Sequence, residues 1–258
     1  MNLNNSTVLI TGGTSGIGLE FVKQLIQQNA NIIITGRDLT KLEQAKKQFP
    51  QIHTLQSDVS NPKDIEKLYQ NVTSQFPQLN IIINNAGIMR NMDLQDTSMS
   101  LEDITREIDT NLSGTIRMAH QFLPHLKTMK NAAIVNVSSG LAFIPLSISP
   151  VYCATKAGVH SYSQSLRLQL KNTSIKVFEL APPGTETPLM DEFTGIVDSN
   201  QNMKVDKMVS IAIKGILKDK LEIRPGLSNV LKIMSRVAPN FIANMLHQTT
   251  EKAKKKLN

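Results

Sequence analysis

Two serines, a tyrosine and a lysine stand close enough in the sequence to share one site. Ser138 and Ser139 follow the apolar run 132–137, and Tyr152 and Lys156 lie four residues apart in a stretch with helical character. Residues four apart share one face of a helix, so the phenol and the ammonium are expected to be neighbours. A nearby cation stabilises a phenolate and so lowers the pKa of a tyrosine from its usual value of about 10. With a serine hydroxyl to hydrogen-bond a substrate oxygen, the group predicts proton transfer at a carbonyl or an alcohol.

The helix that carries Tyr152 and Lys156 has a recognisable start. Ser149 is a plausible N-cap, and Pro150 suits the first helical position. Taken singly, a Tyr-x3-Lys pair occurs on many helices, and a serine after a strand often only caps a turn. The prediction of proton transfer therefore depends on whether another part of the chain forms a binding site for a reaction partner.

A glycine-rich turn near the N-terminus can bind the phosphates of a dinucleotide. It runs from Gly12 to Gly18 (GGTSGIG), after the apolar run 7–11 and before a helical pattern. Glycines let the backbone turn tightly and approach a pyrophosphate, while the start of the helix supplies N–H donors. The spacing differs from G-x-G-x-x-G, and such glycines often serve the turn alone. The position directly after the first strand is what favours a dinucleotide.

The end of the second predicted strand, 31–35, bears on the choice between NAD and NADP. NAD-binding proteins place a carboxylate there, whereas this chain has Gly36 followed by Arg37. The guanidinium of Arg37 can pair with a 2′-phosphate, and Lys41 is a weaker second candidate. Asp38 is also explained as the N-cap of the next helix. We therefore expect NADP(H) in preference to NAD.

The stretches that position these groups alternate between apolar strands and helices. Strands are predicted at 7–11, 31–35, 52–55, 79–83, 132–137, 175–180 and 221–223, and long helices at about 101–127 and 150–170. Strands that are apolar on both faces belong to a parallel sheet covered by helices on each side. We expect a doubly wound α/β (Rossmann) sheet of about seven strands in a single domain, 1–258, with ligands at the carboxyl ends of the strands.

Composition limits the other functions open to the chain. A single cysteine, Cys153, leaves no internal disulfide and argues against a cysteine-based metal site. No apolar run approaches the roughly 18 residues of a membrane span, and no secretory signal is recognisable, so we expect a cytoplasmic protein. The net charge is +7, but the last eight residues, EKAKKKLN, hold four lysines and one glutamate. We interpret this tail as a solvated helix and expect no nucleic-acid or membrane partner, with binding through the tail as the alternative.

Together these motifs resemble the short-chain dehydrogenase/reductase family over essentially the whole chain. Thr11–Gly18 (TGGTSGIG) is similar to the family's cofactor motif TGxxxGIG, and Asn84–Gly87 (NNAG) is similar to its fourth-strand motif. Asp58 and Val59 resemble the acidic pair near the adenine ring. The resemblance implies no metal and a cofactor site made of Gly12, Thr14, Ser15, Gly16, Ile17, Gly18, Arg37, Asp58, Val59, Asn85, Ala86, Gly87, Tyr152, Lys156, Pro182, Thr185 and Thr187.

The resemblance also implies a role for each catalytic candidate. Ser139 lies 13 residues before Tyr152, which is the family's spacing, so Ser139 rather than Ser138 is the catalytic serine. Tyr152 is implied as the general acid/base, and Lys156 as the residue that binds the nicotinamide ribose and lowers the tyrosine pKa. Asn111, in TNLSG, matches the asparagine that holds a water in the proton relay.

One segment departs from the family pattern. After the sixth strand the family has Pro-Gly-x-x-x-Thr, whereas this chain has Pro-Pro-Gly-Thr-Glu-Thr at 182–187. Aligning the terminal threonine puts Pro183 at the glycine position and implies that the Thr185 backbone and the Thr187 side chain lie near the nicotinamide. Because proline lacks an N–H and fixes φ, the loop geometry is expected to differ. The Pro-Pro pair and the stretch 222–242 resemble a bacterial subgroup found beside genes for D-alanylation of teichoic acids, which implies no substrate.

The resemblance implies an oxidoreductase that interconverts a carbonyl and an alcohol with NADP(H). A cofactor-sensing, non-catalytic protein on the same fold and an NAD-linked alcohol dehydrogenase of the family are the alternatives. A substrate lid is expected at about 188–205, where Met190, Phe193, Ile196 and Val197 either line an apolar substrate pocket or pack as ordinary core. Arg90 is the one candidate for a substrate carboxylate, with a surface role as its alternative. A homodimer or homotetramer is expected from the family.

Overall fold

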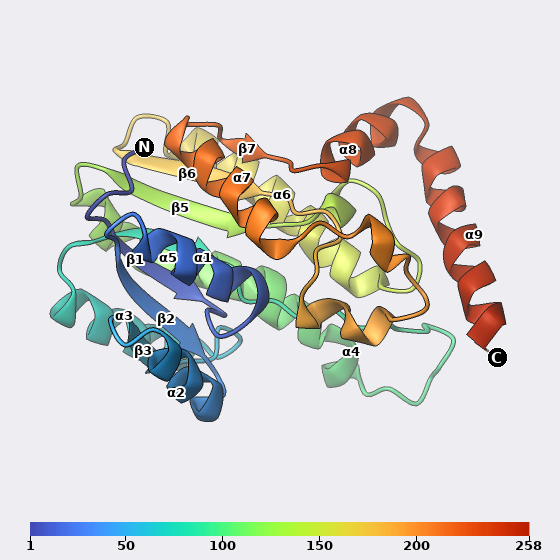
Figure 1. Ribbon diagram of the computed structural model, residues 1–258, viewed down its shortest axis with the longest axis horizontal. Coiled ribbons are helices and arrows are strands. Elements are labelled where there is room, and N and C mark those ends of the chain that lie inside the picture. The colour runs from blue at the N-terminus through green and yellow to red at the C-terminus, as the bar shows by residue number, and fades with distance from the viewer. Residues whose placement is uncertain (258) are drawn as a thin grey trace.

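A seven-stranded parallel sheet organises the chain (Figure 1). The computed structural model describes residues 1–257, apart from the side chains at positions 201, 256 and 257; Asn258, the last residue of the predicted domain, lies outside the described residues. The strand order is β3-β2-β1-β4-β5-β6-β7, which confirms the predicted doubly wound α/β fold. The strands are β1 (Thr7–Thr11), β2 (Asn31–Gly36), β3 (His53–Gln56), β4 (Leu79–Asn84), β5 (Ala132–Val137), β6 (Ile175–Leu180) and β7 (Glu222–Ile223).

Helices cover both faces of the sheet because each strand is apolar on both sides. The helices within residues 1–257 are α1 (Gly16–Ile26), α2 (Leu39–Gln48), α3 (Pro62–Gln75), α4 (Leu101–Glu107), α5 (Gly114–Lys127), α6 (Pro150–Gln169), α7 (Val205–Leu217), α8 (Leu227–Val237) and α9 (Pro239–Leu257). In β1, Val8 and Ile10 belong to the cluster packed under α1, α2 and α7, while Leu9 belongs to the cluster under α3, α5 and α6. This alternation follows the period of two in a strand.

The strand order reverses beside β1, which lies between β2 and β4. In such a sheet the crevice for a ligand lies outside the carboxyl ends of the strands at the point of reversal. Thr11, at the end of β1, pairs with Thr35 of β2, and Ile10 pairs with Ile83 of β4. The glycine turn after β1 and the NNAG segment after β4 therefore meet at one edge of the sheet.

The predicted helix at 101–127 is interrupted. A π-helical segment, η1 (Ile108–Ser113), separates α4 from α5, and Asn111 lies within it. Single π-helical turns are frequent at functional sites because they reorient one side chain. Ser149 is the N-cap residue of α6 and Pro150 begins the helix, as predicted, but the Ser149 hydroxyl donates to the Arg90 carbonyl oxygen at 2.9 Å and makes no capping hydrogen bond.

After β7 the chain leaves the sheet and forms a helical hairpin, α8 and α9. The hairpin stands beyond the carboxyl ends of the strands, and α9 is the outermost element of the view in Figure 1. The predicted lid region holds two short 3₁₀ segments, η3 (Pro188–Phe193) and η4 (Ser199–Gln201). Among the helices of residues 1–257, none combines the length and the apolar character that crossing a bilayer requires.

Candidate active site

A cavity of about 670 Å³ opens at the carboxyl ends of the strands. All of the predicted cofactor-binding residues line it except Gly18, and Ser139 lines it as well. Asn111 does not line the cavity. The structure therefore brings the glycine turn, the Arg37 region and the Tyr152 helix to one hollow, with Gly18 and Asn111 in its supporting layer.

The glycine turn needs its glycines for two separate reasons. Gly12 and Gly16 have φ of +65° and +50°, in the left-handed region that favours glycine. A Cβ on Gly18 would lie 2.2 Å from the Gly12 carbonyl oxygen, so Gly18 lets α1 pack directly beneath the turn. Asn85 holds the turn from the neighbouring strand, because its Nδ2 donates to the carbonyl oxygens of Thr11 and Gly12 at 3.0 and 3.1 Å.

The end of β2 presents a cation at the cavity wall. The Arg37 side chain is 57% exposed, and its Nη1 lies 3.7 Å from a carboxylate oxygen of Asp58. Asp38, the acidic neighbour, accepts a hydrogen bond from the Lys41 backbone N–H at 3.1 Å and so caps α2, as predicted. The Asp38 carboxylate thus serves as the cap of α2, whereas the guanidinium of Arg37 can still turn toward an anion.

Tyr152, Lys156 and Ser139 meet at the buried end of the cavity. Tyr152 is 5% exposed and Lys156 is 4% exposed. The Lys156 Nζ donates to the Val137 carbonyl oxygen at 2.9 Å and lies 5.5 Å from the centre of the tyrosine ring. The Ser139 side chain lies close enough to the Tyr152 phenol to lower the pKa of that phenol. The three groups converge as their spacing predicts.

The electrostatics differ from the expectation for Tyr152. Burial raises the pKa of its phenol, outweighing the hydrogen bond from Ser139, which lowers the pKa. Burial also lowers the pKa of Lys156 to about 8. The net shift of the Tyr152 pKa is therefore opposite to the expected lowering, because desolvation is its largest cause, and the Lys156 ammonium hydrogen-bonds Val137. At neutral pH the phenol keeps its proton.

Asn111 ties the loop after β4 to the Tyr152 helix. Its side chain is fully buried, donates to the carbonyl oxygen of Ile88 at 2.8 Å and accepts from the Ile88 N–H at 2.9 Å. Its Nδ2 also donates to the Thr155 hydroxyl at 3.1 Å. The π-helical turn directs this side chain inward, and its role in a proton relay stays a prediction.

The Pro-Pro loop lies where the family pattern implies, against the cavity. The Pro182 carbonyl oxygen accepts from the Gly140 N–H at 2.7 Å, which joins this loop to the serine loop. Pro183 accepts a hydrogen bond from the Thr185 hydroxyl at 2.9 Å. Thr187 packs against Gly16, where an added Cβ would come within 3.2 Å of its side chain.

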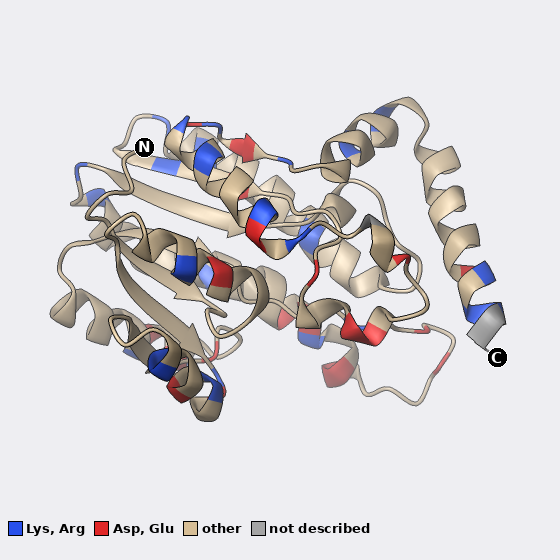
Figure 2. Ribbon diagram, viewed as in Figure 1, with Lys and Arg blue, Asp and Glu red and all other residues tan. Residues whose placement is uncertain are grey.

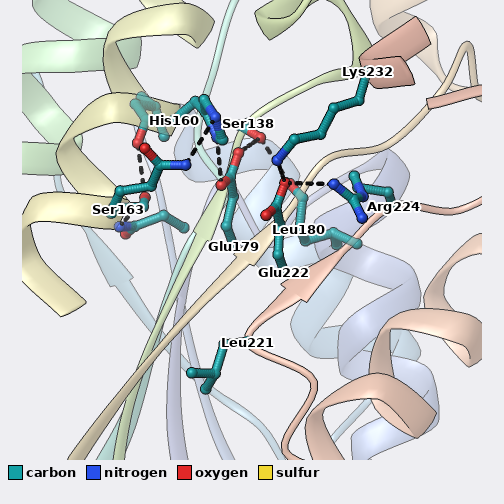
Figure 3. A network of polar contacts seen from close by, with 12 residues as sticks. Ser138, His160, Ser163, Glu179, Leu180, Leu221, Glu222, Arg224 and Lys232 are labelled. Carbon is teal, nitrogen blue, oxygen red and sulfur yellow. Dashed lines mark hydrogen bonds and ion pairs between the residues drawn. The ribbon is translucent and has the colours of Figure 1, made fainter. Parts of the chain in front are cut away.

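A network of polar residues, drawn in Figure 3, lies under the serine loop and was not predicted from the sequence. The Ser138 hydroxyl donates to Glu179 at 2.6 Å, and His160 Nδ1 hydrogen-bonds the other oxygen of the same carboxylate at 2.8 Å. Glu179 is fully buried in β6 and pairs in register with Glu222 of β7, which binds Lys232 of α8. In the sequence, the sign of this network was a single carboxylate, Glu179, within the apolar strand IKVFEL. The network fixes Ser138, next to Ser139, and anchors α8.

The walls nearest to Tyr152 are mostly apolar. Met190, Ile196 and Val197 of the predicted lid line the cavity, whereas Phe193 is 1% exposed and packs in the core beneath them. Sequence reasoning missed the contribution of α8 and α9, which was readable only as helical periodicity after residue 226. The hairpin residues that line the cavity are Leu227, Val230, Leu231, Ile242, Met245, Leu246, Thr249 and Thr250.

Arg90 is not part of the cavity wall. Its Nη1 pairs with an Asp103 carboxylate oxygen at 2.8 Å, and its Nη2 donates to the Asp103 carbonyl oxygen at 2.7 Å. The Arg90 N–H donates to the buried carboxylate of Glu107 at 3.0 Å. These contacts assign Arg90 to the support of α4 and not to a substrate carboxylate.

Comparison with known proteins gives consistent matches. The model of the short chain dehydrogenase family matches residues 6–195. The uncharacterized oxidoreductase DltE of Bacillus subtilis (strain 168) is 46% identical over 189 residues, which cover 73% of this chain and 75% of that protein. A short-chain dehydrogenase from Sphingobium yanoikuyae, solved in complex with NADPH, is 29% identical with a TM-score of 0.77, covering 86% of this chain and 88% of that one. A 3-ketoacyl-(acyl-carrier-protein) reductase from Brucella melitensis, complexed with NADH, is 26% identical with a TM-score of 0.75, covering 83% and 91%.

Proposed function

The chain belongs to the short-chain dehydrogenase family and is an oxidoreductase, and we propose that it reduces an apolar carbonyl compound with NADPH, with Tyr152 as the proton donor. The observation that carries the proposal is the meeting of Tyr152, Ser139 and Lys156 at the buried end of a cavity whose other end is the glycine turn. A proton relay is needed for turnover, whereas a protein that only senses a cofactor has no use for one.

The residues of the cavity fit a nicotinamide dinucleotide. Gly12 and Gly16 let the turn adopt left-handed backbone at the cavity wall, and α1 begins there, where the first N–H groups of a helix have no partner within the helix. Arg37 supplies a cation at the end of β2, where a carboxylate would select NAD. When bound, the reduced cofactor supplies a hydride. One relative is solved with NADPH and another with NADH, so the preference for NADP rests on Arg37.

The chain's own residues divide the proton chemistry among them. The Tyr152 phenol, kept protonated by burial, donates its proton to the substrate oxygen. Ser139 hydrogen-bonds the same oxygen and polarises the carbonyl. Lys156, charged below a pKa of about 8, stabilises the phenolate left behind. With the phenol protonated at neutral pH, Tyr152 is in the state that proton donation to a carbonyl requires.

Apolar walls support an apolar substrate. Leu141, Leu146 and Met190 lie with Tyr152 along the cavity, and the charged residues that line it gather at the Arg37 end, apart from Lys156 and Asp198. A carbonyl on a hydrocarbon chain or ring matches this lining better than a small hydroxy acid.

Tyr152→Phe tests the function because phenylalanine keeps the ring but loses the phenol. We expect NADPH oxidation with a panel of aldehydes and ketones to fall at least about 100-fold, the contribution typical of a general acid. NADPH binding, followed by nucleotide fluorescence, should stay within about twofold of the parent, since no phosphate contact changes.

The parent protein provides the counter-test. Tight NADPH binding with no turnover across the whole panel would favour the cofactor-sensing alternative. A higher kcat/KM with NADH than with NADPH would favour the NAD-linked alternative and remove the role given to Arg37.

A further inference from the structure

Helix α8 buries two polar residues and leaves two apolar residues exposed away from the cavity. Ser228 is fully buried and Lys232 is 9% exposed. Leu227 and Val230 line the cavity, whereas Ile233 and Val237, 54% and 75% exposed, do not line it. A helix on a globular core normally buries its apolar side chains and exposes its polar ones. Ile233 and Val237 are therefore available to a partner outside this chain.

Specific contacts fix this orientation. Lys232 reaches into the network of Figure 3 and binds Glu222, and its Nζ lies 5.1 Å from the centre of the Phe143 ring. Ser228 lies so close to Gly140 that a Cβ there would come within 2.7 Å of its hydroxyl oxygen. Rotating α8 to bury Ile233 and Val237 would break this ion pair and remove the contact between Ser228 and Gly140. The exposure of Ile233 and Val237 is thus part of the native packing.

The apolar surface continues onto α9. Phe241 and Met245, four residues apart, are 64% and 43% exposed. Met245 lines the cavity, whereas Phe241 does not, and Phe241 forms with Ile233 and Val237 what we call the hairpin face. Exposed apolar clusters of this kind mark interaction sites. Val237 and Phe241 flank the turn between the helices and form its tip.

Basic residues accompany the hairpin face. The segment from Leu227 to Asn258 contains six lysines and arginines and one acidic residue, Glu251. Lys252 and Lys255 follow Met245 at steps of seven and ten residues, so they lie on the same stripe of α9 as Phe241 and Met245. Figure 2 shows no acidic residue on α8 or along α9 before its last turns. The hairpin thus combines an apolar tip with a positively charged flank.

We propose that the hairpin face docks on the surface of an anionic lipid bilayer. An apolar helical side at the level of the acyl chains, flanked by lysines at the headgroups, is the arrangement of proteins that lie on a membrane. A second copy fits less well, because an isologous contact would bring two strongly positive hairpins together. The proposal departs from our expectation of a solvated tail, since the apolar side of α8 becomes evident only once its packing is known. The match to the family model ends at residue 195, so the hairpin lies outside it.

Vesicle flotation with the full chain tests the proposal. We expect binding to vesicles of phosphatidylcholine with phosphatidylglycerol at low salt, and much weaker binding to phosphatidylcholine alone or at high salt. The double variant Val237→Ser/Phe241→Ser should bind at least about tenfold more weakly, because apolar area no longer enters the bilayer. Lys252→Gln/Lys255→Gln should lose about 25-fold, from about fivefold for each lysine.

Matched variants elsewhere on the surface serve as controls. Leu101 and Leu168 are 82% and 74% exposed on α4 and α6, and their substitution by serine removes comparable apolar surface. Lys63→Gln/Lys67→Gln removes two exposed lysines of α3. These variants should bind vesicles like the parent, and all variants should keep the parent's thermal midpoint and NADPH affinity, because none of the changed residues lines the cavity.

Three results would overturn the proposal. The first is no binding of the parent to anionic vesicles at low salt, and the second is equal loss of binding in hairpin and control variants. The third is a parent that sediments as an oligomer, ignores vesicles and becomes a monomer in Val237→Ser/Phe241→Ser, which would assign the hairpin face to a second copy.

Discussion

The buried ammonium of Lys156 should cost the protein stability, and Lys156→Met should reveal the cost. The pKa of Lys156 falls from 10.5 to about 8 in the folded chain, because burial disfavours its charged form. This difference corresponds to about 3 kcal/mol of destabilisation at pH values below 8. Methionine keeps most of the side-chain volume without the charge, at the cost of about 1–3 kcal/mol for the Val137 carbonyl that loses its partner.

The sign of the pH dependence follows from linkage. The unfolded chain holds the Lys156 proton up to a higher pH than the folded chain does, so this residue makes wild-type stability rise between pH 8 and 10.5. For wild type the rise between pH 7 and 9.5 amounts to about 2 kcal/mol from this residue alone. The variant lacks this contribution, so its advantage over wild type should shrink by about 2 kcal/mol over the same interval.

Urea unfolding at both pH values measures the difference directly. The loss of the Val137 hydrogen bond is independent of pH and cancels when the two pH values are compared. A difference in unfolding free energy between variant and wild type that stays constant from neutral to alkaline pH would refute the assignment of a desolvated cation. Turnover by Lys156→Met should be lost whatever its stability, because the phenolate then has no cation.

Two other substitutions test separate parts of the site. Arg37→Ser should weaken NADPH binding by about 10- to 100-fold, the value of one charge-assisted contact, and leave NADH binding nearly unchanged. Titration with both nucleotides measures the two affinities. An equal loss of affinity for both would refute the contact between Arg37 and the 2′-phosphate. Lys232→Met should lower the unfolding free energy by about 2 kcal/mol, because Glu222 loses a partner in the network under Ser138. The control variant Arg236→Met, on the exposed side of α8, should change the unfolding free energy by less than about 0.5 kcal/mol. Equal urea midpoints for these two variants would contradict the anchoring role of Lys232.

The sheet and most of the cavity could be predicted because their signals are local. Strand boundaries follow from apolar runs such as TVLIT and AAIVNV, and the glycine turn and Tyr152 stand at fixed places after them. The order of the strands then brings these places to one edge. Periodicity therefore sufficed to place the serine pair, Tyr152 and Lys156 together, whereas the choice of Ser139 over Ser138 came from the family's spacing.

The features that could not be predicted depend on packing between distant segments. The π-helical turn at Asn111 has no local sequence signal, since 101–127 reads as one continuous helix. The raised pKa of Tyr152 depends on burial by the lid and by α9, which spacing along α6 does not report. The orientation of α8, with Ile233 and Val237 exposed, follows from the contact of Lys232 with Glu222, ten residues earlier in the chain. In each case the deciding partner is known only from the fold.

Isotope transfer from the cofactor is the most direct test of the central claim, that Tyr152 serves carbonyl reduction with NADPH. The protein is incubated with NADPH that carries deuterium at both C4 positions, so that transfer from either face is detected, and with an apolar aldehyde or ketone, and the alcohol product is analysed by mass spectrometry. We predict one deuterium on the carbinol carbon in the wild-type reaction, and a rate of its appearance at least about 100-fold lower in Tyr152→Phe. Alcohol without deuterium, or an unchanged rate in Tyr152→Phe, would contradict the claim.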